Sequence, residues 1–223
     1  NDIQSDGLTH SSIWCIVKDN QGTLWLGTYF GGVNYFNPEY EIYTRYSYSS
    51  NEKQGLSNPV VGRTIEDKNG NLWIGTEGGG LNYFNRRTRE FKWYRPQEGR
   101  NSISHNNVKA LYYDADKEII WIGTHLGGMN RLDIRSGHFT HYRMEDNNRQ
   151  TLPSDIVRDI IPYKDLLIVA TQNGVCLFEP DSGKCRQLFK DSKEGKSIKM
   201  VADILLDSEG TLWIAATGEG VFS

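Results

Sequence analysis

The stretch Leu72-Trp73-Ile74-Gly75-Thr76 decides the fold, because the chain repeats it at a nearly constant interval. Related stretches occur at residues 24–28, 120–124, 167–171 and 212–216. The tryptophan position of the repeat falls at residues 25, 73, 121, 168 (where it is Ile) and 213. A period of 45 to 48 residues indicates an architecture assembled from similar units.

Each repeat reads as a set of short strands separated by tight turns. In the second copy the expected strands are 60–66, 72–76, 81–85 and 91–94, and the sequence Asp67-Lys68-Asn69-Gly70 is typical of a hairpin turn. Four antiparallel strands in about 47 residues is the size of one β-propeller blade. We therefore predict an all-β fold, a β-propeller of four-stranded blades. The predicted blades span 9–48, 57–96, 104–144, 153–190 and an incomplete 199–223, about 4.5 blades in all.

Composition narrows the function classes. The 223 residues carry a net charge of −3, which argues against nucleic-acid binding, a function that needs a basic face. No apolar run approaches the roughly 18–20 residues of a membrane span, and the first ten residues show no signal peptide. Three cysteines exclude a paired disulfide framework. A Cys176–Cys185 bridge is conceivable, but buried apolar filler is the expected role of all three.

The motif V-x-x-I-x-x-D-x-x-G-x-L-W-I-G-T-x-x-G-G-L, seen here in Val61–Leu81 with Thr64 at the Ile position, resembles the two-component regulator propeller repeat. The resemblance implies the periplasmic sensor of a membrane-anchored hybrid two-component regulator of Bacteroides-type bacteria, with histidine kinase and transcription-regulating parts outside these residues. It also implies recognition of glycan breakdown products. The fourth copy lacks the tryptophan and the aspartate, and the fifth has Ala215-Ala216 in place of Gly-Thr.

An incomplete propeller has consequences for assembly. A seven-bladed ring of this period needs roughly 330 residues, so we expect the chain to be part of a larger propeller. An open arc leaves strand edges and apolar faces without partners, and self-association is the expected result.

The repeated tryptophans are expected to pack between blades rather than to bind sugars, because each lies mid-strand between apolar neighbours. These structural residues are Trp25, Trp73, Trp121 and Trp213. The repeated Asp–Gly turns do not match a calcium loop, and His138 and His141 are expected on opposite faces of a strand, which excludes a zinc pair. No nucleophile–base constellation and no phosphate-binding loop is present, so we predict no catalytic residue, no metal and no cofactor.

Residues that differ between copies are the candidates for ligand binding, because sites on rigid scaffolds concentrate in loops. The links between second and third strands supply Tyr29, Phe30, Glu77 and His125, and the first strands supply Arg63, Lys109, Arg158 and Asp159. Aromatic, histidine and charged side chains on one rim suit a polar ligand, and an oligosaccharide is the first choice. Two alternatives stay open: a lyase or hydrolase acting on polysaccharide, which would need Glu77, His125 and Asp159 to cluster, and a protein-interaction propeller.

Overall fold

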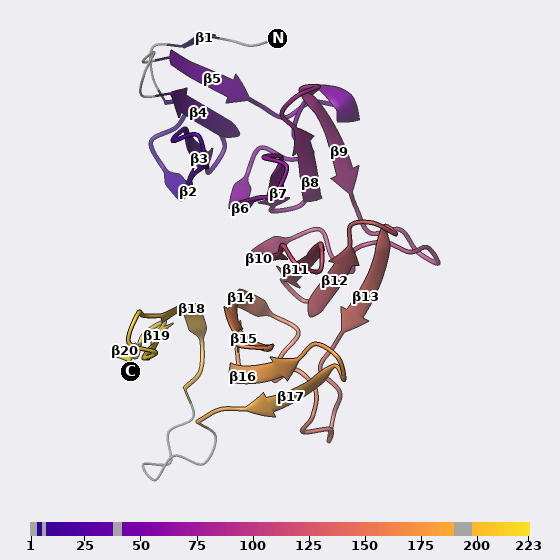
Figure 1. Cartoon of the computed structure of the whole chain (residues 1–223), viewed down its shortest axis with the longest axis vertical. Helices are drawn as coiled ribbons and strands as arrows, with labels where there is room; N and C mark the ends of the chain where they lie inside the picture. The colour runs from indigo at the N-terminus through magenta and orange to yellow at the C-terminus, as the bar shows by residue number, and fades with distance from the viewer. Residues whose placement is uncertain (1–3, 6–7, 38–41, 190–197) are drawn as a thin grey trace.

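The computed structural model describes residues 4–5, 8–37, 42–189 and 198–223 and shows five small sheets arranged in an arc (Figure 1). The prediction of a partial all-β propeller is confirmed. The sheets follow one another along the chain, and the first and last lie on either side of the opening of the arc (Figure 1). Each sheet runs in chain order from an inner strand to an outer strand, as in a propeller blade.

The strand boundaries are as follows. The first blade holds β2 (Ile13–Lys18), β3 (Leu24–Thr28), β4 (Val33–Asn37) and β5 (Ile42–Tyr46), with β1 (Gln4–Ser5) added beside β5. The second holds β6 (Val61–Glu66), β7 (Leu72–Thr76), β8 (Gly80–Asn85) and β9 (Glu90–Tyr94), preceded by the short 3₁₀ helix η1 (Glu52–Gln54). The third holds β10 (Val108–Asp114), β11 (Ile119–Thr124), β12 (Met129–Asp133) and β13 (His138–Tyr142). The fourth holds β14 (Val157–Tyr163), β15 (Leu166–Thr171), β16 (Gly174–Glu179) and β17 (Lys184–Gln187). The last holds β18 (Val201–Leu206), β19 (Leu212–Ala216) and β20 (Gly220–Phe222).

The repeated tryptophans fill the gaps between successive blades. Trp25, Trp73 and Trp121 are 3%, 2% and 1% exposed, so none of the three offers a ring face to a sugar. The Trp25 ring contacts Phe84 of the second blade, and the Trp121 ring contacts Phe178 of the fourth. Such aromatic burial between sheets is a main source of stability.

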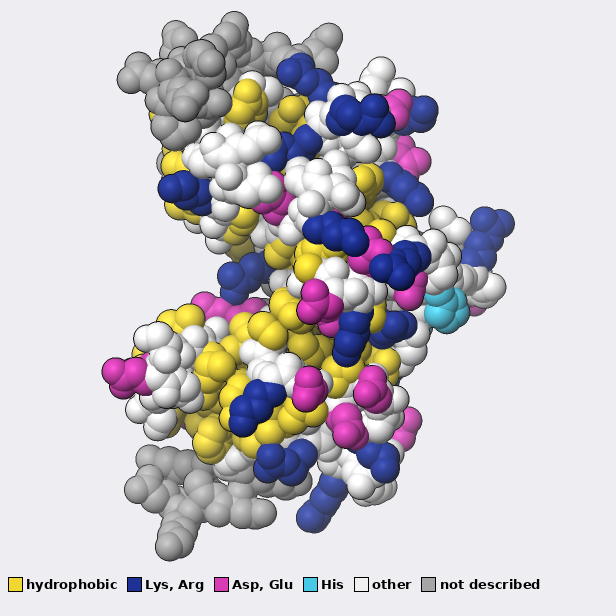
Figure 2. Space-filling view, viewed as in Figure 1, with side chains coloured by type: hydrophobic (Ala, Val, Ile, Leu, Met, Phe, Trp, Pro, Cys, Tyr) yellow, Lys and Arg dark blue, Asp and Glu magenta, His cyan; other side chains and the backbone are white. Residues whose placement is uncertain are grey.

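The other two copies of this position differ. Ile168, which replaces the tryptophan in the fourth blade, is buried with Val201, Ile204 and Ile214 of the last blade. Trp213 is 40% exposed, because the described residues contain no sheet beyond β18–β20 against which it could pack. Hydrophobic side chains also gather at the surface over the last two blades (Figure 2).

The aspartate of the repeat does more than shape its turn. Asp19 accepts hydrogen bonds from the backbone N–H groups of Gln21 and Thr23, both at 2.9 Å, and from the Trp25 indole Nε1 at 2.8 Å. Asp67 and Asp207 make the same three contacts with their own turns and with Trp73 and Trp213. One carboxylate therefore fixes both the hairpin turn and the orientation of the interblade indole.

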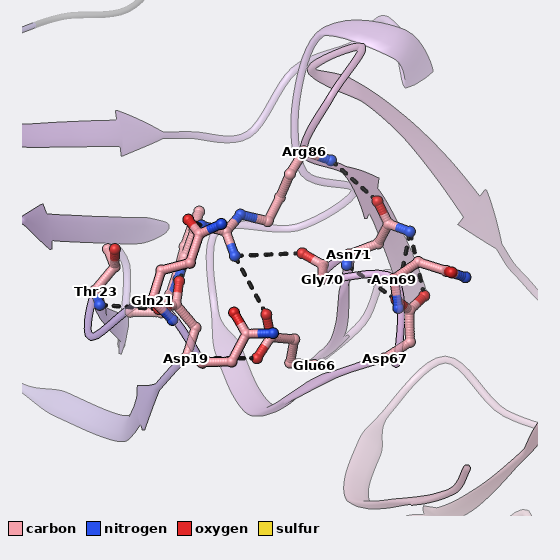
Figure 3. Close-up of polar contacts among 11 residues, drawn as sticks. Asp19, Gln21, Thr23, Glu66, Asp67, Asn69, Gly70, Asn71 and Arg86 are labelled. Atoms are coloured by element: carbon pink, nitrogen blue, oxygen red, sulfur yellow. Dashed lines mark hydrogen bonds and ion pairs between the residues drawn. The ribbon is translucent and has the colours of Figure 1, made fainter. Parts of the chain in front are cut away.

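Arg86 ties the first two of these turns together (Figure 3). Its guanidinium lies 3.0 Å from the Asp19 carboxylate and 3.3 Å from that of Glu66, and it covers the Trp25 ring at 5.2 Å from the ring centre. Burial alone would raise the pKa of Asp19, but the hydrogen bonds from Trp25, Thr23 and Gln21 and the charge of Arg86 lower it overall.

The cysteines are free in this structure. Cys176 and Cys185 are buried on neighbouring strands of the fourth blade, and their Sγ atoms lie 3.3 Å apart. The hydrogen-bonded contact with Cys185, followed by burial, raises the pKa of Cys176. Both side chains belong to the core of the third and fourth blades, as expected of small apolar side chains.

Candidate functional site at the propeller rim

A β-bulge interrupts the first strand of every blade near the same end. The pairing register shifts between Ile13 and Cys15, and at the corresponding place in β6, β10, β14 and β18. Bulges leave a residue unpaired and redirect its side chain, and they are common beside binding sites. We call these unpaired residues the bulge row: Trp14, Gly62, Lys109, Arg158 and Ala202.

The links between second and third strands lie on the same face as the connections between blades. The Glu77 N–H donates to the Val60 carbonyl of its own blade, and Glu77 also bridges to Asn107, which precedes β10 of the next blade. His125 bridges in the same way to Ile156, which precedes β14. Equivalent link residues form what we call the loop row: Tyr29, Glu77, His125, Gln172 and Thr217.

An exposed aromatic wall lies at the start of this rim. Trp14 is 50% exposed and stacks on Tyr29 with ring centres 5.2 Å apart, and Phe30, 57% exposed, meets Tyr29 edge-on at 4.4 Å. His10 contacts the edges of both Tyr29 and Phe30. Unlike the interblade tryptophans, these rings are in large part exposed to solvent.

Polar side chains continue the rim from the aromatic wall. Lys109 forms an ion pair with Glu77, and its ammonium lies 5.7 Å from the centre of the Trp14 ring. Lys109 belongs to the third blade and Trp14 to the first, so the contact crosses the second blade. Gly62 is the bulge-row residue of that intervening blade, and it has no side chain. A Cβ at position 62 would lie 3.2 Å from the Val108 carbonyl oxygen, so the space beside the neighbouring backbone is tight there.

His125 extends the polar part toward the fourth blade. Its ring lies 6.5 Å from that of His105, and its Nδ1 is buried without a hydrogen-bond partner among the residues that the structure describes. Burial, followed by the positive charges of Arg158 and Lys109, lowers the pKa of His125. The imidazole is therefore neutral near pH 7, with one nitrogen able to donate and the other able to accept a hydrogen bond.

A separate charged cluster lies one residue further along the inner strands. Arg63 is 2.6 Å from Asp203 and 3.6 Å from Asp159, which joins the second blade to the last and the fourth. All three residues follow the bulge of their strand, and Asp159 and Asp203 pair with Ala170 and Ala215 of the second strands. Burial and the neighbouring Asp203 carboxyl raise the pKa of Asp159 to about 6.

The structure thus divides the predicted ligand residues into two groups. Contacts along the rim connect Tyr29, Phe30, Glu77 and Lys109, and His125 and Arg158 follow at the next blade junction. Arg63 and Asp159 instead form the inner cluster with Asp203. The three residues required by the lyase or hydrolase alternative are therefore split, since Asp159 pairs with Arg63 while Glu77 pairs with Lys109.

Sequence reasoning missed two features of this region. It did not identify the stack of Trp14 on Tyr29, and the only signal was that both residues belong to the first repeat. It also missed a hollow of about 540 Å³, which lies on the outer strands β5 and β9 and is lined by Arg45, Tyr48, Lys53 and Arg89 among others. That hollow lies apart from the aromatic wall, and its Lys53 is paired with Glu90.

Residues 4–5, 8–37, 42–189 and 198–223 contain no group of three or more His, Cys, Asp or Glu side chains placed to hold a metal ion. No helix within the same ranges has the length and apolar character needed to cross a membrane.

Comparisons with solved structures give the same fold. The chain is similar to the extracellular domain of the putative hybrid two component system BT3049 from B. thetaiotaomicron, with 25% identity and a TM-score of 0.80 over 98% of this chain and 29% of that one. The extracellular domain of the putative hybrid two component system BT4673 from the same organism gives 24% identity and a TM-score of 0.75, over 99% and 31%. The chain thus spans about three tenths of the length of these structures.

Enzymes share the fold at lower identity. Virginiamycin B lyase from Staphylococcus aureus matches with 12% identity and a TM-score of 0.67, over 100% of this chain and 72% of that one. No curated protein gives a significant match.

Three segments of the chain match a known family of repeats. The sequence description of the two component regulator propeller matches residues 7–30, 55–78 and 102–125. Each matched segment contains a bulge-row residue and the second strand of its blade. The first three blades of this partial propeller are therefore built from two component regulator propeller repeats.

Proposed function

We propose that this chain is part of the extracellular sensor of a membrane-anchored hybrid two-component regulator, and that it binds an oligosaccharide at the rim. The propeller repeats and the similarity to the extracellular domain of BT3049 support the sensor role. The observation that carries the binding proposal is the solvent-facing stack of Trp14 on Tyr29, set beside the Lys109–Glu77 ion pair.

The chemistry of the rim suits a sugar. The C–H face of a pyranose ring packs on flat aromatic surfaces, which Trp14, Tyr29 and Phe30 provide at 37% exposure or more. Hydroxyl groups need donors and acceptors side by side, and Lys109, Glu77 and neutral His125 supply both. The same rim has no carboxylate pair that could act as general acid and base, so we propose binding rather than catalysis.

A rim ligand would touch several blades at once. Trp14 and Tyr29 belong to the first blade, Glu77 to the second and Lys109 to the third. A ligand shifts a conformational equilibrium only through its differential affinity for the two states. A sugar that spans these blades would favour one relative arrangement of them, and that change in blade packing is the signal we propose for transmission toward a histidine kinase that controls transcription.

The test is a glycan panel screened by thermal shift, followed by calorimetric titration of each hit. We expect Trp14→Ala and Tyr29→Ala to lower affinity by about 5- to 150-fold, which corresponds to the 1–3 kcal/mol per stacked ring of aromatic platforms. Tyr48→Ala is the matched control, because Tyr48 is 55% exposed and lines the outer hollow. Unchanged affinity in both rim variants, with a loss in the Tyr48 variant, would refute the rim site.

A further inference from the structure

Arg158 differs from the other cations of the rim and inner cluster. Lys109 is paired with Glu77, and Arg63 with Asp203. The half-buried Arg158 side chain has no hydrogen bond or ion pair with any described residue. Since no described carboxylate pairs with this guanidinium, the position is open to an anionic partner from outside the chain.

The surroundings of Arg158 form a small cavity between the fourth and last blades. It encloses about 270 Å³, and its other lining residues are Met200, Val201, Ala202 and Thr217. None of these side chains carries a negative charge, and the Ala202 side chain at the bulge row is small. The space in front of Arg158 is thus open, weakly polar and free of a competing carboxylate from its own lining.

The position of this cavity continues the rim. Arg158 is the bulge-row residue of the fourth blade, as Trp14 and Lys109 are for the first and third. His125 precedes it along the rim through the bridge to Ile156, and the positive charge of Arg158 contributes to the lowered pKa of that histidine. A ligand that stacks on Trp14 and extends past Lys109 and His125 therefore reaches a guanidinium at its far end.

We propose that the saccharide is anionic and that Arg158 binds its carboxylate or sulfate group. The planar guanidinium fork pairs with such groups through two parallel hydrogen bonds, and charge-assisted bonds of this kind are the strong ones. The neutral part of the ligand packs on the aromatic wall, and the acidic residue lies in the cavity between the fourth and last blades. This inference rests on the proposed function, since it specifies the class of sugar at the same rim.

The experiment separates the charge from the rest of the ligand. Calorimetric titrations use galacturonate and glucuronate oligosaccharides, the methyl esters of the same compounds, and sulfated oligosaccharides with their desulfated counterparts. We expect at least one acidic compound to bind ten to a hundred times more tightly than its neutral counterpart, the range of one charge-assisted hydrogen-bonded contact. Comparison of the uronate titrations with the sulfated-oligosaccharide titrations shows whether the site recognises a carboxylate or a sulfate.

Variants assign the effect to Arg158. Arg158→Gln should remove the preference for the acidic compound and leave the affinity for its methyl ester within about twofold. Arg158→Lys should keep part of the preference, because the charge remains and the fork is lost. Arg186→Gln is the matched control, since Arg186 is an exposed arginine on β17 of the same blade. Thermal melts confirm that each variant is folded.

The outcomes are distinguishable. Binding of neutral members without any preference for acidic ones would overturn this inference and leave the rim proposal standing. A preference that survives Arg158→Gln but is lost in Arg45→Gln would place the anion in the outer hollow and also overturn the inference. Absence of binding by every saccharide would remove the proposed function and this inference together.

Discussion

Replacing Asp19 by Ala tests how the repeat holds its blades together. The Asp19 side chain is fully buried and accepts three hydrogen bonds of 2.8 to 2.9 Å, and Arg86 of the second blade lies 3.0 Å away. The substitution leaves two backbone N–H groups and the Trp25 indole without this acceptor, and it removes one of the two carboxylates beside Arg86. Breaking a buried pair of this kind costs about 3–5 kcal/mol, which is the expected loss in the free energy of unfolding.

The assay is urea unfolding followed by tryptophan fluorescence, and the chain supplies its own control. Asp207 makes the same three contacts in the last blade, but its indole partner Trp213 is 40% exposed and no arginine among the described residues pairs with it. Asp207→Ala should therefore cost clearly less than Asp19→Ala. Equal losses in the two variants, or a loss below 1 kcal/mol for Asp19→Ala, would refute the argument that the buried carboxylate joins the turn to the blade interface.

The lowered pKa of Asp19 predicts how the free energy of unfolding of the native protein and of Asp19→Ala should differ with pH. A carboxyl whose pKa is lower in the folded state contributes its full stability above its unfolded pKa of about 3.9. That contribution is lost as the pH falls through the folded pKa. The stability difference between the native protein and Asp19→Ala should therefore be constant from pH 7 to 5 and shrink in stronger acid.

Four further outcomes are expected. Trp73→Ala should cost about 3–5 kcal/mol and Trp213→Ala clearly less, as measured by urea midpoints, because Trp73 is 2% exposed and Trp213 is 40% exposed. The pKa of Asp159 is raised to about 6 in the folded protein, so the folded state binds this proton more tightly than the unfolded state does between pH 6 and 4. The contribution of Asp159 to the free energy of unfolding should therefore rise as the pH falls from 7 to 5. In thermal melts, Asp159→Asn should abolish that rise. Tyr29→Ala should change the free energy of unfolding by no more than about 0.5 kcal/mol, as for other surface sites; a larger loss would show that the ring supports the fold. The isolated chain should self-associate in light scattering through the exposed Ile16, Leu205 and Val221, which are 61%, 62% and 67% exposed, and a monomer at high micromolar concentration would contradict this.

The architecture could be predicted from the sequence because the length of the repeat can be read directly from the spacing of its tryptophan strands. The strand that contains each tryptophan, the turn before it and the burial of Trp73 and Trp121 all follow from the spacing of apolar residues and glycines. The exposure of Trp213 could not be predicted from its own repeat, because burial of this position depends on a neighbouring blade. Its immediate sequence, Leu212-Trp213-Ile214, closely resembles that of the buried copies.

The contacts between residues of the candidate site were harder to predict than the residues themselves. The constant spacing between Asp19 and Trp25, repeated between Asp67 and Trp73, indicated the carboxylate–indole hydrogen bond. The bond was missed because a role in the hairpin turn is already sufficient to account for an aspartate at this position. The contact of Lys109 with Trp14 joins the third blade to the first, across the second. Such contacts arise from the curvature of the arc, and no local pattern encodes them.

A crystal structure of the protein with a bound acidic oligosaccharide tests the central claim most directly. Our account predicts a sugar ring on the Trp14–Tyr29 stack, hydroxyl contacts to Lys109 and Glu77, and a carboxylate or sulfate within hydrogen-bond distance of Arg158. A ligand found in the outer hollow beside Arg45 and Lys53, with the rim unoccupied, would contradict the account.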